Sequence, residues 1–147
     1  MYVPHFEALL KNLGMSREEF ASSDQVKVPT SLLRFLLQIA LANSDFNETG
    51  YRQANPDVDA AAMEGRIESP RLHYIGNGYF EDRKGATPEV DERWYLRTYN
   101  DVADAVRSGT VQSAQRHFIQ CGAAEMRAPS AMYEPDAVQW ARAVGKI

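Results

Sequence analysis

The sequence has little of what marks a disulfide-stabilised, membrane-spanning or secreted protein. One cysteine, Cys121, stands among 147 residues, which excludes an internal disulfide framework and a cysteine-based zinc site. The most apolar segment runs from Leu32 to Ala42, about half the length that crosses a bilayer. The first residues show no basic region followed by an apolar one, as a secretory signal would. We therefore expect a cytoplasmic protein without a transmembrane segment, with export by a signal-independent route left open.

Basic residues are not gathered in any one place. The formal net charge is −4, from 16 Lys and Arg against 20 Asp and Glu. Because a nucleic-acid-binding domain normally carries a basic face, nucleic acid is not an expected partner. The apolar fraction of 44% and the charged fraction of 24% are ordinary for a soluble protein. At this length we expect one domain, residues 1–147.

An internal repeat occupies the middle of the chain. A shift of 44 positions places residues 46–84 on residues 90–128 without a gap, and twelve of the 39 pairs are identical. A period of this length suits a unit of several helices. The predicted segments are an N-terminal helical segment at 1–45, a first repeat at 46–88, a second repeat at 89–129 and a C-terminal capping helix at 130–147.

Helix-capping residues divide each copy into three short helices. In the first copy Asn47 stands where it can cap the first helix, and Asn55 with Pro56 opens the second as cap and first helical residue. Serine opens the third helix, and glycine ends the second and third. No alternating pattern indicates a strand. The predicted fold class is all-α, a compact bundle of short helices with two tandem 44-residue repeats and helical caps at both ends.

The flanking segments are predicted to cover the open ends of the repeat pair. The helix from Leu32 to Ala42 is apolar on nearly every side, which is typical of a buried helix. We expect it to be the core against which both repeats pack, with an exposed homodimer face as the alternative. After the repeats, a capping helix is predicted with Trp140 turned inward. Cys121, at a helix end, is expected to be a partly buried thiol.

Both copies resemble a helical repeat of bacterial proteins. That repeat usually runs Y-L-x-x-N-P-D-V-A-x-A, then a glycine, then S-A-x-x-H-Y-x-x-x-G-x-x-E-G-R. The copies keep its tyrosine, Asp-Val, histidine–aromatic and Glu-x-Arg elements, and depart from it at Asp82 and Met126, where it has glycine, and at Asn100, where it has proline. Such repeats lie beside glycosyltransferase domains and in large secreted or cell-surface proteins. The resemblance implies a module of a polysaccharide-synthesis or surface-protein assembly, with no agreed catalytic residue.

Each copy carries an aspartate, a histidine, a glutamate and an arginine at matching positions. They are Asp57, His73, Glu81 and Arg83, and Asp101, His117, Glu125 and Arg127. A zinc site needs three or four converging ligands, whereas each copy offers one histidine. We predict that the four residues form one polar staple per repeat, which holds that repeat together. A histidine-dependent enzyme or metalloprotein is the weaker alternative.

Four aromatic residues have no aromatic counterpart in the other copy. They are Tyr79, Phe80, Trp94 and Tyr99. Aromatic faces stack on the C–H surfaces of sugars, and tyrosine and tryptophan add a polar group. These four are therefore candidates for a glycan-binding surface, with core packing as the competing interpretation.

No motif predicts a reaction. The sequence has neither a nucleophile elbow nor a phosphate-binding glycine loop, so we predict no catalytic residue, no metal and no cofactor. The expected function is a non-enzymatic protein-interaction or scaffold module, an adaptor whose partner is another protein. A homodimer through the helix from Leu32 to Ala42 is one form of this, and a glycan-binding module is the alternative function.

Overall fold

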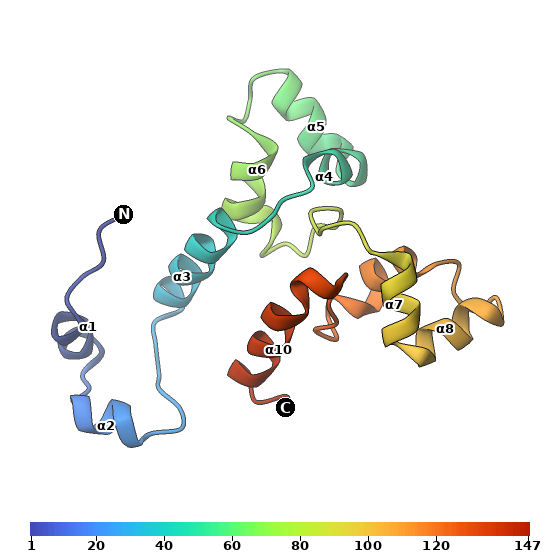
Figure 1. Cartoon of the computed structure of the whole chain (residues 1–147). Helices are drawn as coiled ribbons and strands as arrows, with labels where there is room; N and C mark the ends of the chain where they lie inside the picture. The colour runs from blue at the N-terminus through green and yellow to red at the C-terminus, as the bar shows by residue number, and fades with distance from the viewer. The chain divides into compact units, whose positions relative to one another are not determined.

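The computed structural model describes residues 1–147, which form helices and turns without a strand (Figure 1). The predicted all-α class is confirmed. The chain divides into two compact units, Met1–Asn43 and Ser44–Ile147, where one domain was expected. None of the helices combines the length and the apolar character that crossing a bilayer requires.

The first unit contains three helices, α1 (Phe6–Leu13), α2 (Arg17–Ser22) and α3 (Thr30–Ala42). Helices α1 and α2 contact each other through the rings of Phe6 and Phe20, whose centroids lie 5.2 Å apart. Leu10 is the only buried side chain of this unit. The unit therefore has very little hydrophobic core.

The prediction that α3 is a buried core helix is wrong. No residue of α3 is buried, and Leu33, Phe35 and Leu36 are 48%, 54% and 52% exposed. A helix that is apolar on every side needs neighbours on every side to be buried, and two short helices cannot supply them. The homodimer alternative for this helix stays a prediction.

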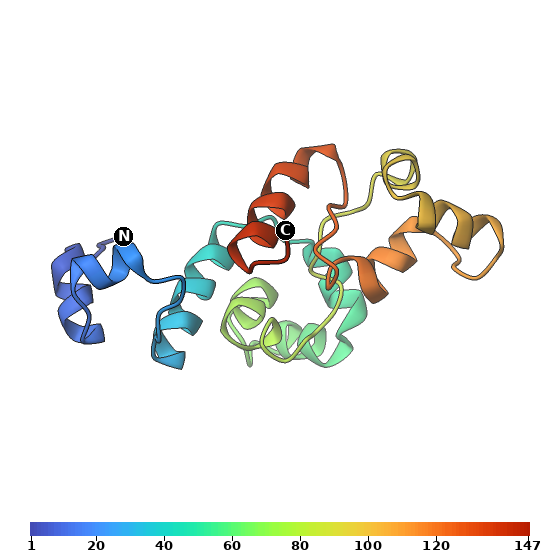
Figure 2. The ribbon, with the colours of Figure 1, turned by 90° about the horizontal axis from the view of Figure 1, so that it is seen from below.

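The second unit contains two sets of helices whose bounds differ by 44 residues throughout. The first set is α4 (Glu48–Ala54), α5 (Pro56–Met63), α6 (Pro70–His73) and the π-helical turn η1 (Tyr74–Gly78). The second set is α7 (Glu92–Thr98), α8 (Asn100–Arg107), α9 (Ala114–His117) and the π-helical turn η2 (Phe118–Gly122). The two sets occupy separate parts of the unit in both views (Figures 1 and 2).

The capping residues behave largely as predicted. The Asn47 side chain accepts from the Gly50 N–H at 2.9 Å, and the serines at 69 and 113 cap α6 and α9. Asn55 is the exception, because its side chain makes no capping hydrogen bond to α5. It is buried, and its Nδ2 donates to the carbonyl oxygens of Tyr51 at 2.7 Å and Lys84 at 2.9 Å.

Each repeat has a separate hydrophobic core. The first consists of Tyr51, Val58 and Ala86, and the second of Tyr95, Val102, Ala114 and Phe118. The end of each repeat returns to its own start, since the backbone N–H of Asn47 donates to the Ala86 carbonyl and that of Asp91 to the Pro129 carbonyl, both at 3.0 Å. The bundle is thus built from two small closed repeats.

A turn of 3₁₀-helix, η3 (Ala131–Tyr133), leads into the last helix, α10 (Glu134–Ala143). Ala141 is buried, and beyond the helix the Lys146 ammonium donates to the Glu125 carbonyl at 2.7 Å. Lys146 thus connects the end of the chain to the last turn of the second repeat, and the capping role of α10 stays a prediction. Trp140 is 51% exposed, so the prediction that it turns inward is wrong. The small residues Ala137 and Ala141 form the inner side instead.

The turn that ends each repeat holds a non-glycine residue in the left-handed conformation. Asp82 has a φ of 57° and Met126 a φ of 62°, and both stand where the resembling repeat has glycine. A side chain disfavours this conformation because its Cβ crowds the following carbonyl, by about 1–2 kcal/mol. The left-handed backbone gives a physical reason for glycine in the resembling repeat. In this chain both copies have a side chain at this position and therefore carry some backbone strain.

Replacing Met126 by glycine should therefore raise the free energy of unfolding by about 1 kcal/mol, because it removes the strain of a side chain at positive φ. The measurement is thermal denaturation followed by circular dichroism. Met126→Val should lower stability, since β-branched residues tolerate positive φ least. Asp82→Gly should gain less, because aspartate enters this region more readily. A lower melting temperature for Met126→Gly would contradict the assignment of strain.

Candidate functional site

A buried tyrosine hydroxyl lies at the centre of each repeat. Tyr51 on α4 is fully buried, and its Oη lies 3.0 Å from Nδ1 of His73 on α6. Tyr95 on α7 is likewise fully buried, with its Oη 3.1 Å from Nδ1 of His117 on α9. Each hydrogen bond connects the first helix of a repeat to the third. Sequence reasoning did not identify this contact.

The same hydroxyl contacts a glycine of the π-helical turn. A Cβ built on Gly78 would lie 2.0 Å from the Tyr51 Oη, and one built on Gly122 would lie 2.3 Å from the Tyr95 Oη. In the turn, the Tyr79 N–H donates to the Tyr74 carbonyl five residues earlier, at 2.9 Å, which is the π-helical pattern. Glycine at these two positions is therefore a requirement of close approach.

Burial raises the pKa of both tyrosine hydroxyls above the ordinary value. Since the unperturbed value is already about 10, both hydroxyls keep their protons at neutral pH. A neutral hydroxyl donates to an unprotonated Nδ1 or accepts from a protonated one. The pair is therefore a structural hydrogen bond that a neutral tyrosine hydroxyl makes with the histidine ring.

Three of the four predicted polar-staple residues come together in each repeat. Arg83 Nη1 donates to Asp57 at 2.8 and 2.9 Å, and its Nε donates to Glu81 at 2.7 Å. In the second repeat Arg127 makes the same contacts with Asp101 and Glu125. Each arginine thus connects the end of its repeat to the first turn of the second helix.

The polar staple as predicted is wrong in one respect, because the histidine is not part of it. His73 and His117 bond to the buried tyrosines, and the aspartate–glutamate–arginine cluster forms separately on the surface. The sequence could not separate the two groups, since both follow the same 44-residue spacing. The structure places no group of three or more His, Cys, Asp or Glu residues where it could hold a metal ion.

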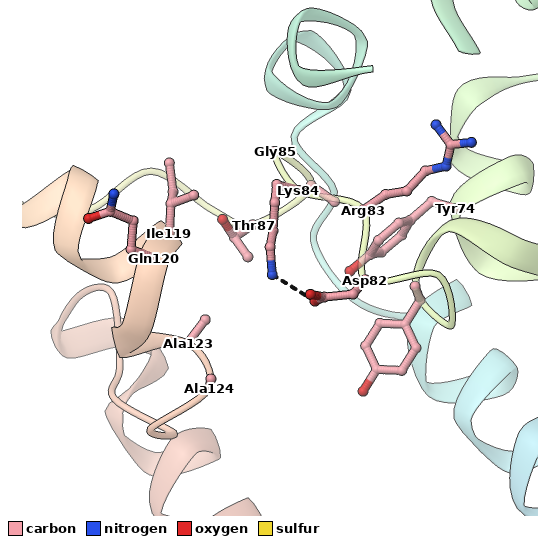
Figure 3. Close-up of a pocket in the computed structure, with 12 residues that line it drawn as sticks. Tyr74, Asp82, Arg83, Lys84, Gly85, Thr87, Ile119, Gln120, Ala123 and Ala124 are labelled. Atoms are coloured by element: carbon pink, nitrogen blue, oxygen red, sulfur yellow. Dashed lines mark hydrogen bonds and ion pairs between the residues drawn. The ribbon is translucent and has the colours of Figure 1, made fainter. Parts of the chain in front are cut away.

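A pocket of about 390 Å³ lies between the two repeats; we name it the inter-repeat pocket. Its first wall comes from the end of the first repeat and its second wall from η2 and the turn after it. The residues that line it are Tyr74, Tyr79, residues 82–87, Ile119, Gln120, Ala123 and Ala124. Figure 3 shows Tyr74 and Asp82 on one side, Ile119 and Ala123 on the other, and Lys84 ion-paired to Asp82. That ion pair measures 2.7 Å.

The structure separates the four candidate binding aromatics. Tyr79 lines the inter-repeat pocket and is 42% exposed. Phe80 is half-buried beside it, with the two ring centroids 5.3 Å apart, and does not line the pocket. Trp94 and Tyr99 pack against the core of the second repeat. Both are partly buried, so packing against the core accounts for much of their surface, and their candidacy as binding residues stays a prediction.

Tyr99 has a structural role that the sequence did not reveal. It occupies the place of Asn55, whose side chain donates to the Lys84 carbonyl. In the second repeat the direction reverses, because the Ala128 N–H donates to the Tyr99 hydroxyl at 2.9 Å. The 44-residue shift aligns Asn55 with Tyr99 and residue 84 with residue 128. Asparagine and tyrosine are too different for the sequence to indicate that they bond to the same backbone position.

Cys121 is exposed, so the prediction of a partly buried thiol is wrong. It occupies the place of Asn77, which is also exposed, in the matching π-helical turn. The side of the turn that faces the repeat core is taken by Phe118 and Gly122, which are both buried.

The chain matches no protein-family model, no curated protein and no solved structure. The resemblance to a bacterial helical repeat therefore stays a prediction that rests on the motif residues. The site has to be interpreted from its own geometry.

Gly78→Ala should destabilise the protein by about 2–3 kcal/mol, because the new Cβ would overlap the Tyr51 hydroxyl and force both groups apart. Removing the hydroxyl in Tyr51→Phe should restore part of this loss, so the two changes should be strongly non-additive in chemical denaturation. Gly76→Ala is the matched control in the same turn, since nothing lies within 4 Å of its built Cβ. Equal losses for the two glycines would refute the close contact.

The stability of the protein at acidic pH tests the surface cluster of Asp101, Glu125 and Arg127. The hydrogen bonds from Arg127 lower the pKa of Asp101 below its ordinary value. A carboxylate with a lowered pKa contributes stability above the unfolded pKa, about 3.9, and loses it as the pH falls through the folded pKa. The difference in melting temperature between wild type and Asp101→Asn should therefore shrink on acidification.

Asp24→Asn, outside any such cluster, serves as the control for that experiment. The difference in melting temperature between Asp24→Asn and wild type should not shrink in this way as the pH falls. A constant difference for Asp101→Asn between neutral and acidic pH would mean that the ionic form of this pair contributes nothing.

Proposed function

We propose that this protein is a non-enzymatic interaction module that binds another protein through α3. The observation that carries the proposal is an apolar helix without a buried residue. Leu33, Phe35 and Leu36 expose about half of their surface each, and Arg34 is the only charged residue of the helix. Protein interfaces are depleted of charge at their centre and enriched in aromatic residues.

The size of the helix suits a contact of this kind. Thirteen residues of α-helix span about 20 Å, and a specific interface covers about 800 Å² on each partner. One face of α3 with the residues around it can supply much of that area. An exposed apolar patch of this extent is unusual for a surface that contacts water alone.

The polar residues of the repeats support an architectural role for the second unit. Both histidines are engaged by tyrosines, and both Asp–Glu pairs are engaged by arginines of the same repeat. These groups hold helices together within one repeat. The second unit is then a scaffold, and we infer an adaptor in a bacterial surface-polysaccharide or surface-protein assembly from the motif resemblance. A cytoplasmic location belongs to the same proposal.

The test is partner capture at native expression, with chemical cross-linking, for wild type and for Phe35→Ser/Leu36→Ser. The wild type should capture a defined protein that the double variant loses, because the apolar contact area is removed. Leu72→Ser is the matched control, since Leu72 is 47% exposed but lies in the second unit. It should leave capture intact.

Sedimentation velocity on the purified wild type distinguishes a second copy from a different protein as the partner. A dimer that dissociates in Phe35→Ser/Leu36→Ser identifies the homodimer form of the proposal. A monomeric wild type that captures no protein would refute the proposed function.

A further inference from the structure

The inter-repeat pocket is lined in part by residues at which the two copies differ in chemistry. The framework residues are the same in both copies, including the buried tyrosines, the histidines and the arginine clusters. Tyr74 and Arg83 of the first wall likewise correspond to Phe118 and Arg127. Four other residues that give this wall polar or aromatic groups have an apolar aliphatic residue as counterpart. These pairs are Tyr79/Ala123, Asp82/Met126, Lys84/Ala128 and Thr87/Ala131. The first repeat therefore carries a set of chemical groups that its fold does not require.

The second wall differs in the complementary way. Ala123 and Ala124 line the pocket and stand where the first repeat has Tyr79 and Phe80. A ring at position 123, the place that Tyr79 has in the first copy, is therefore expected to reduce the space in the pocket.

Each cation that lines the pocket is paired with a carboxylate. The Lys84 ammonium pairs with the Asp82 carboxylate at 2.7 Å, and the Arg83 guanidinium is neutralised by Asp57 and Glu81. A phosphate or carboxylate ligand would find no unbalanced cation here. The ion pair nevertheless offers N–H donors and carboxylate acceptors side by side, and both side chains are more than half exposed to the pocket and solvent.

The remaining lining is amphipathic. The first wall adds the rings of Tyr74 and Tyr79, while Ile119 and the two alanines are apolar and Gln120 offers an amide. The volume of about 390 Å³ lies within the range of small-molecule sites, about 300–1,000 Å³. A ligand that fits must be uncharged, must carry adjacent hydroxyl groups and must present an apolar face.

A pyranose ring meets these requirements. We propose that the inter-repeat pocket binds a neutral sugar unit of a glycan, with its C–H face on Tyr79 and its hydroxyl groups bonded by Asp82, Lys84 and Gln120. An aromatic ring supplies a large rigid contact for such a face, and each hydroxyl both donates and accepts. The pocket lies in the second unit and α3 in the first, so separate variants test this proposal and the proposed function.

The experiment is a titration of the ¹⁵N-labelled full chain followed by amide chemical shifts. The probes are neutral tetrasaccharides of glucose, galactose, mannose and rhamnose, a glucuronic acid oligomer, and a lysine- and arginine-rich peptide. At least one neutral saccharide should give saturable shifts at pocket residues such as Gly85 and Gln120. Tyr79→Ala should weaken the dissociation constant by roughly tenfold or more.

Ala123→Tyr is the decisive variant, because it fills the pocket with the residue that the first copy has at that position. The backbone already suits tyrosine, since Ala123 has φ −62° and ψ −42°, and Tyr79 has φ −59° and ψ −44°. Binding should be lost with an unchanged melting temperature, while Ala123→Ser should bind like wild type. If Ala123→Tyr does not fold, Ala124→Phe and Tyr79→Ala decide the question.

Three results would overturn the proposal. The first is that no neutral saccharide shifts the pocket resonances, and the second is that binding survives in Ala123→Tyr. The third is that the glucuronic acid oligomer or the peptide binds in the pocket while the neutral saccharides do not. In that last case the pocket recognises an anionic sugar or a protein side chain.

Discussion

The contact between a buried tyrosine hydroxyl and the backbone of a glycine is the constraint on which each repeat depends. The ring of Tyr51 or Tyr95 is buried in the core of its repeat, and its hydroxyl lies against a glycine of the π-helical turn that continues the third helix. The glycine belongs to a π-helical turn, in which each hydrogen bond spans five residues and the turn holds one residue more than in an α-helix. The histidine then satisfies the buried hydroxyl, which would otherwise lose its hydrogen bond to water.

This arrangement lets a very short chain close on itself. Short helices are marginal alone because helix nucleation is costly. Each repeat compensates with a buried tyrosine in its core, a backbone hydrogen bond between its ends and a surface arginine cluster. Because the two cores do not merge, residues between the repeats are released from core packing. Chemical differences between the copies, such as Tyr79/Ala123, occur there.

The exposed apolar helix and the inter-repeat pocket belong to different units of the chain. The first unit has one buried side chain and an apolar helix with no buried residue, whereas the second has closed cores and a pocket whose cations are paired with carboxylates. An apolar helix in a unit with almost no core has little reason to remain uncovered. A pocket lined by an ion pair, an amide and tyrosine rings has the character of a site for a polar, uncharged ligand. The proposed partner-binding helix and the proposed glycan pocket therefore belong to different units of the chain.

The sequence by itself determined the all-α class, the 44-residue displacement and most helix boundaries, because capping residues and glycines act within a few residues of where they stand. It also identified which residues define the repeat. Only the tertiary structure decided which of these residues meet. His73 and Arg83 follow the same spacing, yet one bonds to a buried tyrosine and the other to surface carboxylates. The exposure of α3 and Trp140, the core positions of Trp94 and Tyr99, and the pocket beside Tyr79 were likewise decided by packing. The apolar or aromatic character of a side chain predicts that it will be covered but not by which surface, since that depends on contacts between residues far apart in the chain.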